Sequence, residues 1–507
     1  MDRLIFAKGH RMTLVLESRR DITLETFRRV AWQGEAVRLD ERALDTIERA
    51  RHAFLALLDA DPDLVVYGVT SGYGQMAHLR YTSEERKEHA RRPPIAPMTS
   101  FGEPLPERVA RGMVLARLTN VVEGHAAVSP GLARAVAGLL DGGPLPPVPA
   151  LGNGCSGEIQ ALAHLFSGLF EALARGELGE LRDLGEKESL ALVNGSPCAT
   201  ALAADAALAA RRRLMLAVAV FALSIEALKA PLDHYDAVFD DLWEDPGEAA
   251  VLRLLRAWLE GAGAERRAYQ APVSWRILPR VLGQAWRAMD QAEEVAGLGL
   301  RAVSDNPLFV LPDGANPLGR VLSNGGFHNG RAYPAMDNLA AAWADLALLC
   351  DRHVTKLLDA RTSHLPAYLS PSGEGHMGTG EGYIGCLGFS AVGYAEQARL
   401  AATRHFLPGS EGGGFGQNDV ALPTFLAWRS EAEAGRCLEA NLAQLAVIAS
   451  QAFHVTDRAA PPRLAPLLDE VRAHCPPLTA TRGLAGDVEG LAGSFTAKVF
   501  GDGALEP

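Results

Sequence analysis

The chain is poor in the features that mark zinc-binding, disulfide-rich and membrane-spanning proteins. Its six cysteines include no CxxC pair, and no closely spaced histidines accompany them. This pattern argues against a zinc site and a disulfide framework, and it fits a reducing compartment. The amino-terminal segment lacks the apolar run of a signal peptide, and the longest apolar run, residues 214–225, is too short to cross a bilayer. We therefore expect a cytoplasmic protein with no metal and no membrane partner.

Extended basic clusters and phosphate-binding loops are also lacking. The 49 Lys and Arg residues are outnumbered by 61 Asp and Glu residues, which gives a formal charge of −12. A short basic cluster at residues 211–213 leads into the apolar run and is typical of a solvated helix start. The sequence contains neither GxxxxGK followed by Ser or Thr nor a GxGxxG after a clear strand. It thus predicts no nucleic-acid partner.

Long segments with helical spacing dominate what is present. Ala, Leu, Arg and Glu are abundant, which favours helix. Apolar residues recur at helical spacing in five long segments, at residues 40–58, 200–229, 336–358, 382–404 and 430–453. Such lengths predict an all-α fold with a central bundle of long helices. We expect a loop-rich part at residues 1–200 and a long-helix part at residues 201–507 that form one integrated unit.

Three glycine-rich loops, at residues 67–75, 142–158 and 408–419, interrupt the helical segments. Glycine permits positive φ and close approach of the backbone, so loops of this kind are where a site would be expected. For any single loop, an ordinary turn is the competing interpretation.

Three kinds of chemistry can be considered for the run Gly154-Cys155-Ser156-Gly157-Glu158. A nucleophile elbow is excluded, because G-x-S-x-G would need glycine at position 158. A nucleophilic Cys155 would need a histidine partner that the sequence does not locate. In the third interpretation, the amide nitrogen of Gly157 attacks the carbonyl carbon of Cys155. Loss of one water from the ring and one from Ser156 then leaves an exocyclic methylidene. Glycine suits the attacking position, because a Cβ would obstruct the compressed geometry.

The surrounding segments favour the third interpretation. VPALGNGCSGEIQALAHL, residues 148–165, resembles the signature of the histidine, phenylalanine and tyrosine ammonia-lyases and the related 2,3-aminomutases. Further matches follow in the order of that family, and the resemblance covers roughly residues 20–455. They lie at residues 66–74, 102–105, 190–195, 274–279, 304–308, 327–328 and 417–419.

This resemblance implies a homotetramer of long helices in which several subunits build each active site. It implies that Cys155, Ser156 and Gly157 become a methylidene-imidazolone electrophile, so that no added cofactor is required. Tyr67 would be the base that removes the β-proton of a small amino acid substrate. Asn194 would orient the substrate or polarise the ring carbonyl.

The resemblance also implies a set of substrate-binding residues. Arg276 would hold the substrate carboxylate, for which a planar guanidinium is suited. Phe327 would pack beside the electrophile, and Gln417 and Asn418 would lie near the substrate amine. Ala96 and Pro97 align with the pair that selects the substrate side chain.

Several positions depart from the family pattern. Cys155 replaces the usual alanine, which is compatible with cyclisation because this residue contributes mainly its carbonyl. Glu158 replaces aspartate and Gly326 replaces asparagine. Val273 stands where the family has a second tyrosine, and Tyr269 is a candidate substitute.

The selector pair departs most. Ala96 and Pro97 carry no side-chain donor or acceptor, so we expect histidine and tyrosine both to be poor substrates. Asp245 and Glu411 are candidates for new polar contacts to the substrate.

Three functions are compatible with these residues. The first is elimination of ammonia from an α-amino acid, and the second is a 2,3-aminomutase on the same scaffold. These two differ in lid closure and product retention, which sequence separates poorly. The third is an inactive homologue that acts as a subunit or binder. Retention of Tyr67, Ser156, Asn194 and Arg276 argues against it.

Overall fold

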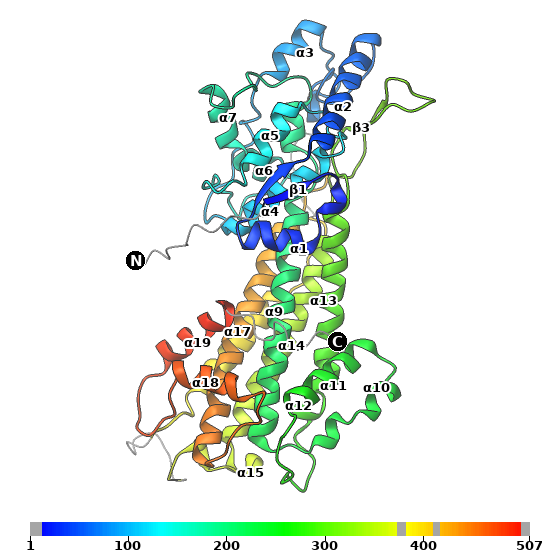
Figure 1. The fold of residues 1–507 in the computed structure, drawn as a ribbon. Helices are drawn as coiled ribbons and strands as arrows, with labels where there is room; N and C mark the ends of the chain where they lie inside the picture. The colour runs from blue at the N-terminus through cyan, green and yellow to red at the C-terminus, as the bar shows by residue number, and fades with distance from the viewer. Residues whose placement is uncertain (1–12, 373–381, 409–415, 498–507) are drawn as a thin grey trace. The chain divides into compact units, whose positions relative to one another are not determined.

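The fold was analysed in a computed structural model that describes residues 13–372, 382–408 and 416–497. Helices dominate, and the named strands of these residues form two short pairs (Figure 1). β1 (Thr13–Leu16) pairs in parallel with β2 (Ala36–Leu39), and β3 (Leu308–Val310) pairs antiparallel with β4 (Arg320–Leu322). The expected all-α class is confirmed.

The chain divides into two compact units. The first comprises the described parts of residues 1–208, 292–334 and 405–429, and the second those of residues 209–291, 335–404 and 430–507. The first boundary lies close to the expected one at residue 200, but two later segments belong with the first unit. The reason is helix length, because a helix of 32 residues is about 48 Å long and meets different neighbours at its two ends. Four helices have residues in both units: α9 (Pro197–Leu228), α13 (Leu278–Arg301), α14 (Ala332–Leu358) and α17 (Thr424–Val455).

Shorter helices make up the rest of the first unit. They are α1 (Leu24–Phe27), α2 (Glu41–Ala60), α3 (Ser83–Ala90), α4 (Glu107–Val121), α5 (Pro130–Gly138), α6 (Ile159–Leu165), α7 (Ser167–Ala174) and α8 (Glu188–Val193). A π-helical turn at Arg28–Trp32 and 3-10 turns at Arg19–Asp21 and Gly74–Met76 connect them.

One core cluster of the first unit supports the loop that carries Tyr67. α2 begins after Asp40, whose carboxylate caps the helix by accepting from the backbone of Arg42. Further along α2, Phe54 packs edge-to-face on Phe309 with 5.6 Å between ring centroids. Val66 belongs to the same buried cluster. The residue directly before Tyr67 is therefore fixed by hydrophobic burial.

The second unit surrounds its segments of the long helices with short ones. These are α10 (Val238–Leu242), α11 (Pro246–Trp258), α12 (Val273–Arg276), α15 (Ala360–Ser363), α16 (Leu387–Ala401), α18 (Ala465–His474) and α19 (Ala485–Ala497). Two 3-10 turns, Leu232–Tyr235 and Ala367–Leu369, complete it.

Buried polar pairs tie the long helices together in this unit, where α9, α14 and α17 run alongside one another (Figure 1). Glu431 of α17 accepts from Arg213 of α9 at 2.6 Å and from the indole of Trp343 of α14 at 2.8 Å. Ser224 of α9 bonds His353 of α14 at 3.0 Å. Breaking one of these buried pairs would leave an unpaired polar group in the bundle, so they specify how the helices align.

The five predicted long helices are all present, with ends that differ by a few residues. They correspond to α2, α9, α14, α16 and α17. The run at residues 214–225 is almost wholly buried inside α9. Over the residues described, no helix combines the length and apolar character needed to cross a bilayer.

Candidate active site

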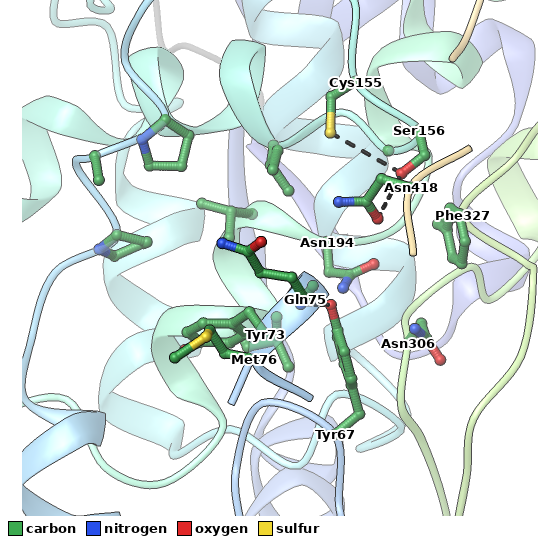
Figure 2. Close-up of a pocket in the computed structure, with 18 of the residues that line it drawn as sticks. Tyr67, Tyr73, Gln75, Met76, Cys155, Ser156, Asn194, Asn306, Phe327 and Asn418 are labelled. Carbon is green, nitrogen blue, oxygen red and sulfur yellow. Dashed lines mark hydrogen bonds between the residues drawn. The ribbon is translucent and has the colours of Figure 1, made fainter. Parts of the chain in front are cut away.

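A cavity of about 510 Å³ in the first unit gathers most of the predicted site residues (Figure 2). Its lining comes from segments far apart in the sequence: the loop after Val66, the stretch around residues 89–97, the loop before α6, the carboxyl end of α8, and three later residues, Asn306, Phe327 and Asn418. The signature segment and the matching segments at residues 66–74, 190–195, 304–308, 327–328 and 417–419 thus all contribute to one cavity.

The cavity has two walls that differ in character. The electrophile wall consists of Tyr67, Cys155, Ser156, Gly157, Asn194, Phe327 and Asn418. The selector wall consists of His89, Arg92, Pro93, Pro94, Ala96 and Pro97.

The tripeptide Cys155-Ser156-Gly157 lies in the loop that leads into α6. The hydroxyl of Ser156 donates to Oδ1 of Asn418 at 3.0 Å, and the carbonyl of Cys155 accepts from the backbone of Leu422 at 3.3 Å. Figure 2 shows the first of these bonds. A Cβ added to Gly157 would meet the ring of Phe327 at 3.9 Å, an ordinary contact. Packing alone therefore does not require glycine at this position.

Tyr67 points its hydroxyl towards Asn194 in Figure 2. The phenolic oxygen accepts from the backbone N–H of Gly74 at 2.9 Å. This hydrogen bond fixes the position of the phenolic oxygen. Gly68 makes the turn possible: its φ is +66°, and a Cβ there would come within 2.5 Å of the Tyr73 ring. The glycines of this loop thus position Tyr67.

Asn194 follows the last residue of α8 and turns its side chain to the cavity. Its backbone carbonyl accepts from Arg117, a fully buried side chain of α4. Burial lowers the pKa of Arg117, and the charge of Asp305 opposes that shift. The backbone of Asn194 is therefore held by a buried guanidinium rather than by solvent.

Glu158 anchors the tripeptide to the start of α9. Its carboxylate accepts from the backbone N–H groups of Cys198 at 2.5 Å and Ala199 at 2.7 Å. The side chain is buried, and burial raises the pKa of Glu158 to about 7 despite these two bonds. The first turn of a helix has free N–H groups that suit a carboxylate. Glutamate in place of the family's aspartate thus has a defined role in this structure.

The selector wall is more open and less polar at the expected positions. Ala96 is exposed and Pro97 half-buried, and both line the cavity as the alignment implied. His89 and Arg92, a few residues earlier, line it too. Sequence reasoning missed these two, together with Tyr73, Gln75 and Asn306. The only available signal was that His89 and Arg92 precede the selector pair in the same segment.

Two predicted substrate-binding residues are not brought to the cavity. Gln417 is exposed and is not part of the lining, although Asn418 is. Arg276 belongs to the second unit, at the end of α12, where its Nε donates to the carbonyl of Ala271 at 3.1 Å. Their roles in substrate binding stay predictions.

The candidate compensating residues also lie elsewhere. Tyr269 is in the second unit and 75% exposed, and Val273 is exposed on α12. Asp245 caps α11 and pairs with Arg287 in the same unit. These contacts explain Asp245 without a substrate. Glu411 lies outside the described residues.

A long-helix fold whose cavity unites a tyrosine, an x-Ser-Gly tripeptide and an asparagine defines an enzyme of the ammonia-lyase and aminomutase class. The family model described as aromatic amino acid lyase matches residues 22–474. The chain therefore belongs to the aromatic amino acid lyase family, which confirms the resemblance noted in the sequence.

Individual relatives agree with this assignment. The chain is 32% identical to histidine ammonia-lyase of Deinococcus radiodurans over 379 residues, 70% of each chain. The chain is 28% identical to histidine ammonia-lyase of Aromatoleum aromaticum over 504 residues, which cover 94% of this chain and 93% of the relative. The protein is thus an enzyme of the ammonia-lyase kind.

Solved structures show the same fold. Tyrosine aminomutase from Streptomyces globisporus has a TM-score of 0.84 at 23% identity, covering 96% of this chain and 97% of that one. Histidine ammonia-lyase from Trypanosoma cruzi has a TM-score of 0.81 at 22% identity, covering 96% and 94%.

Proposed function

We propose that this protein eliminates ammonia from an α-amino acid by means of an electrophile formed from Cys155, Ser156 and Gly157. The observation that carries the proposal is the shared cavity: Tyr67, Ser156 and Asn194 come from three distant segments and line one space. An inactive homologue would not need this combination.

The residues of the tripeptide fit a methylidene-imidazolone. Among the described residues, no partner accepts from the N–H of Gly157, so this nitrogen is free to close the ring. Gly157 has no Cβ to obstruct the attack, and the carbonyl of Cys155 lies in the same turn. The hydroxyl of Ser156, which must leave as water, is oriented by Asn418. Once formed, the group supplies an electrophilic methylidene carbon at the cavity surface.

The remaining steps are carried by side chains of the electrophile wall. Tyr67 acts as the general base and accepts the β-proton of the substrate, which leaves it as a neutral phenol, and the N–H of Gly74 orients its oxygen through a hydrogen bond. The amide of Asn194 offers a donor and an acceptor to the bound amino acid. Phe327 covers the tripeptide with an apolar ring and limits the access of water. Ammonia leaves, and the product is an α,β-unsaturated acid.

Arg276 binds the substrate carboxylate in this proposal, and a second subunit of a homotetramer supplies it. The resemblance to the family implies such sharing, and Arg276 is absent from the cavity lining of its own chain among the described residues.

Co-expression of two inactive variants tests whether one site draws on two subunits. Chains carrying Ser156→Ala and chains carrying Arg276→Ala would each be inactive alone. Mixed tetramers would regain part of the activity only if one site draws on two subunits. Tetramer assembly and cytoplasmic location remain predictions.

The central experiment is Ser156→Ala, measured by intact mass and by turnover. The natural protein should be lighter than its sequence mass by two waters, and the variant should not, because it has no hydroxyl to eliminate. The variant should lose turnover and keep its fold. Ser167→Ala on α7, where the hydroxyl only donates to the carbonyl of His164, is the matched control. Equal turnover of Ser156→Ala and the natural protein would contradict the proposal.

The turnover assay also distinguishes a lyase from an aminomutase, because the two enzymes form different products. A lyase releases ammonia and accumulates the unsaturated acid, which absorbs in the ultraviolet when the side chain is aromatic. An aminomutase accumulates a β-amino acid instead.

A further inference from the structure

The selector wall carries polar groups that the alignment did not assign. Ala96 and Pro97 offer no side-chain donor or acceptor, yet His89 and Arg92 line the same cavity. Both lie at or just beyond the end of α3 (Ser83–Ala90). The polar side chains of this wall therefore lie a few residues before the pair that the alignment assigned.

His89 is held in place while one of its nitrogens is left without a partner. Its ring lies between those of Tyr73 and Tyr81, with centroid distances of 5.0 Å and 4.9 Å. Its Nε2 is buried and has no hydrogen-bond partner among the described residues. A buried polar atom of this kind is costly unless a ligand or water meets it. Burial, and then the charge of Arg92, lowers the pKa of His89, so the imidazole is neutral at pH 7 and can present an N–H.

Arg92 supplies the charge of the wall. Its side chain is 69% exposed and pairs with the equally exposed Glu88 at 2.6 Å. An exposed pair of this kind contributes little free energy, so the guanidinium can turn to a ligand at small cost. No Asp or Glu is present in the described lining of the cavity, and Arg92 is its one formally charged side chain. The lining therefore favours an anion at this wall.

Apolar residues make up much of the rest of the cavity lining. They include Met76, Ile159, Leu190 and Val193, together with the prolines of the selector wall. A ligand that fills the space would combine an apolar body with an anionic end.

We propose that Arg92 and His89 select the substrate side chain, and that this side chain is apolar with a terminal oxyanion such as a carboxylate. The inference rests on the proposed ammonia-lyase function and names its substrate class. Arg92 donates to the carboxylate, and the N–H of His89 donates to the same group. Histidine and tyrosine lack the anionic end and gain nothing from this wall.

Two amino acids of similar size test the proposal: 4-carboxyphenylalanine and 4-methylphenylalanine. Wild-type kcat/KM should favour the carboxylated substrate. Arg92→Gln should lower kcat/KM for that substrate by about 10- to 100-fold, the range for a hydrogen-bonded charged group. For the methylated substrate the loss should be at least 10-fold smaller. His89→Phe keeps a ring between Tyr73 and Tyr81, removes Nε2, and should reduce the preference in the same direction. Glu88→Gln removes the surface partner of Arg92 and is the control, with little change on either substrate.

Equal losses on both substrates would show that Arg92 holds the α-carboxylate, which would overturn the proposal. An unchanged preference in Arg92→Gln would overturn it as well. Calorimetric binding of 4-carboxycinnamate and 4-methylcinnamate gives a readout that needs no turnover. If neither amino acid releases ammonia but Arg92→Gln selectively weakens 4-carboxycinnamate, the proposed reaction fails and the assignment of the selector wall stands.

Discussion

The two walls of the cavity are built by different means. Hydrogen bonds hold the groups of the electrophile wall in place. The backbone N–H of Gly74 donates to Tyr67, Arg117 donates to the backbone carbonyl of Asn194, and Glu158 accepts from the backbone at the start of α9. The selector wall is formed by exposed or half-buried residues, and its charged member, Arg92, is paired only at the surface. Hydrogen bonds to backbone groups or from buried side chains thus hold the electrophile wall in place, whereas the side chains of the selector wall can change at little cost to the fold.

Removal of the base should produce the largest effect on the electrophile wall. We expect Tyr67→Phe to reduce kcat by about 10²- to 10⁴-fold, the usual contribution of a positioned acid or base. KM should change less, because the ring remains. Steady-state kinetics give the measurement. Tyr73→Phe is the matched control, since Tyr73 packs edge-on to Tyr67 with 6.3 Å between centroids. A larger loss in Tyr73→Phe than in Tyr67→Phe would reverse the assignment of the base.

The raised pKa of buried Glu158 predicts that the free energy of unfolding falls as the pH rises, an effect not expected from the selector wall. Because its pKa is raised from 4.5 to about 7 in the folded state, the folded protein binds more protons than the unfolded chain between these values. The free energy of unfolding should therefore fall as pH rises from 4.5 to 7, by up to roughly 3 kcal/mol from this group. Glu158→Gln should remove this contribution. Urea unfolding of both proteins at pH 5 and pH 8 measures it, and parallel pH profiles would refute it.

Arg276→Lys tests whether a residue outside this cavity completes the electrophile wall. An ammonium cannot reproduce a bidentate fork, so we expect kcat/KM to fall by about 10- to 100-fold, mainly through KM. Arg253→Lys, an exposed arginine on α11, provides the control. Unchanged KM and kcat in Arg276→Lys would place Arg276 outside the site.

The smallest effect is expected at the original selector positions. Histidine and tyrosine should both be slow substrates, because Ala96 and Pro97 provide no hydrogen bond to an imidazole or phenol. Ala96→His should raise kcat/KM for tyrosine by roughly 10-fold, the value of about one hydrogen bond. Ultraviolet absorbance of the unsaturated product measures this change. Fast conversion of either amino acid by the natural protein would contradict this interpretation of the pair.

Sequence patterns predicted the parts of the structure that depend on local repetition. The spacing of apolar residues located α2, α9, α14, α16 and α17, because helical periodicity is visible over many turns. Family motifs located Tyr67, Ser156 and Asn194, and the structure places them around one cavity. Helix ends differed by a few residues, because they depend on capping contacts such as that of Asp40.

Residues without a periodic or motif context were not predictable. His89 and Arg92 lie where α3 ends and the chain turns, so no repeat marks them, and only the folded lining shows that they reach the cavity. Gln417 and Asn418 are adjacent in sequence, yet only Asn418 faces Ser156. Sequence adjacency says nothing about which of two neighbouring side chains turns inward in an irregular loop.

By itself the sequence determined the helical class, the family and the residue types available for the reaction, because these follow from composition, periodicity and ordered motifs. Tertiary structure alone decided three further matters. It paired Asp245 with Arg287 of α13, it gave Glu158 a buried partner at α9, and it brought a cationic and an imidazole side chain to the wall where the motif offers none. Each of these depends on contacts between segments distant in sequence, and such contacts are set by the packing of the whole unit.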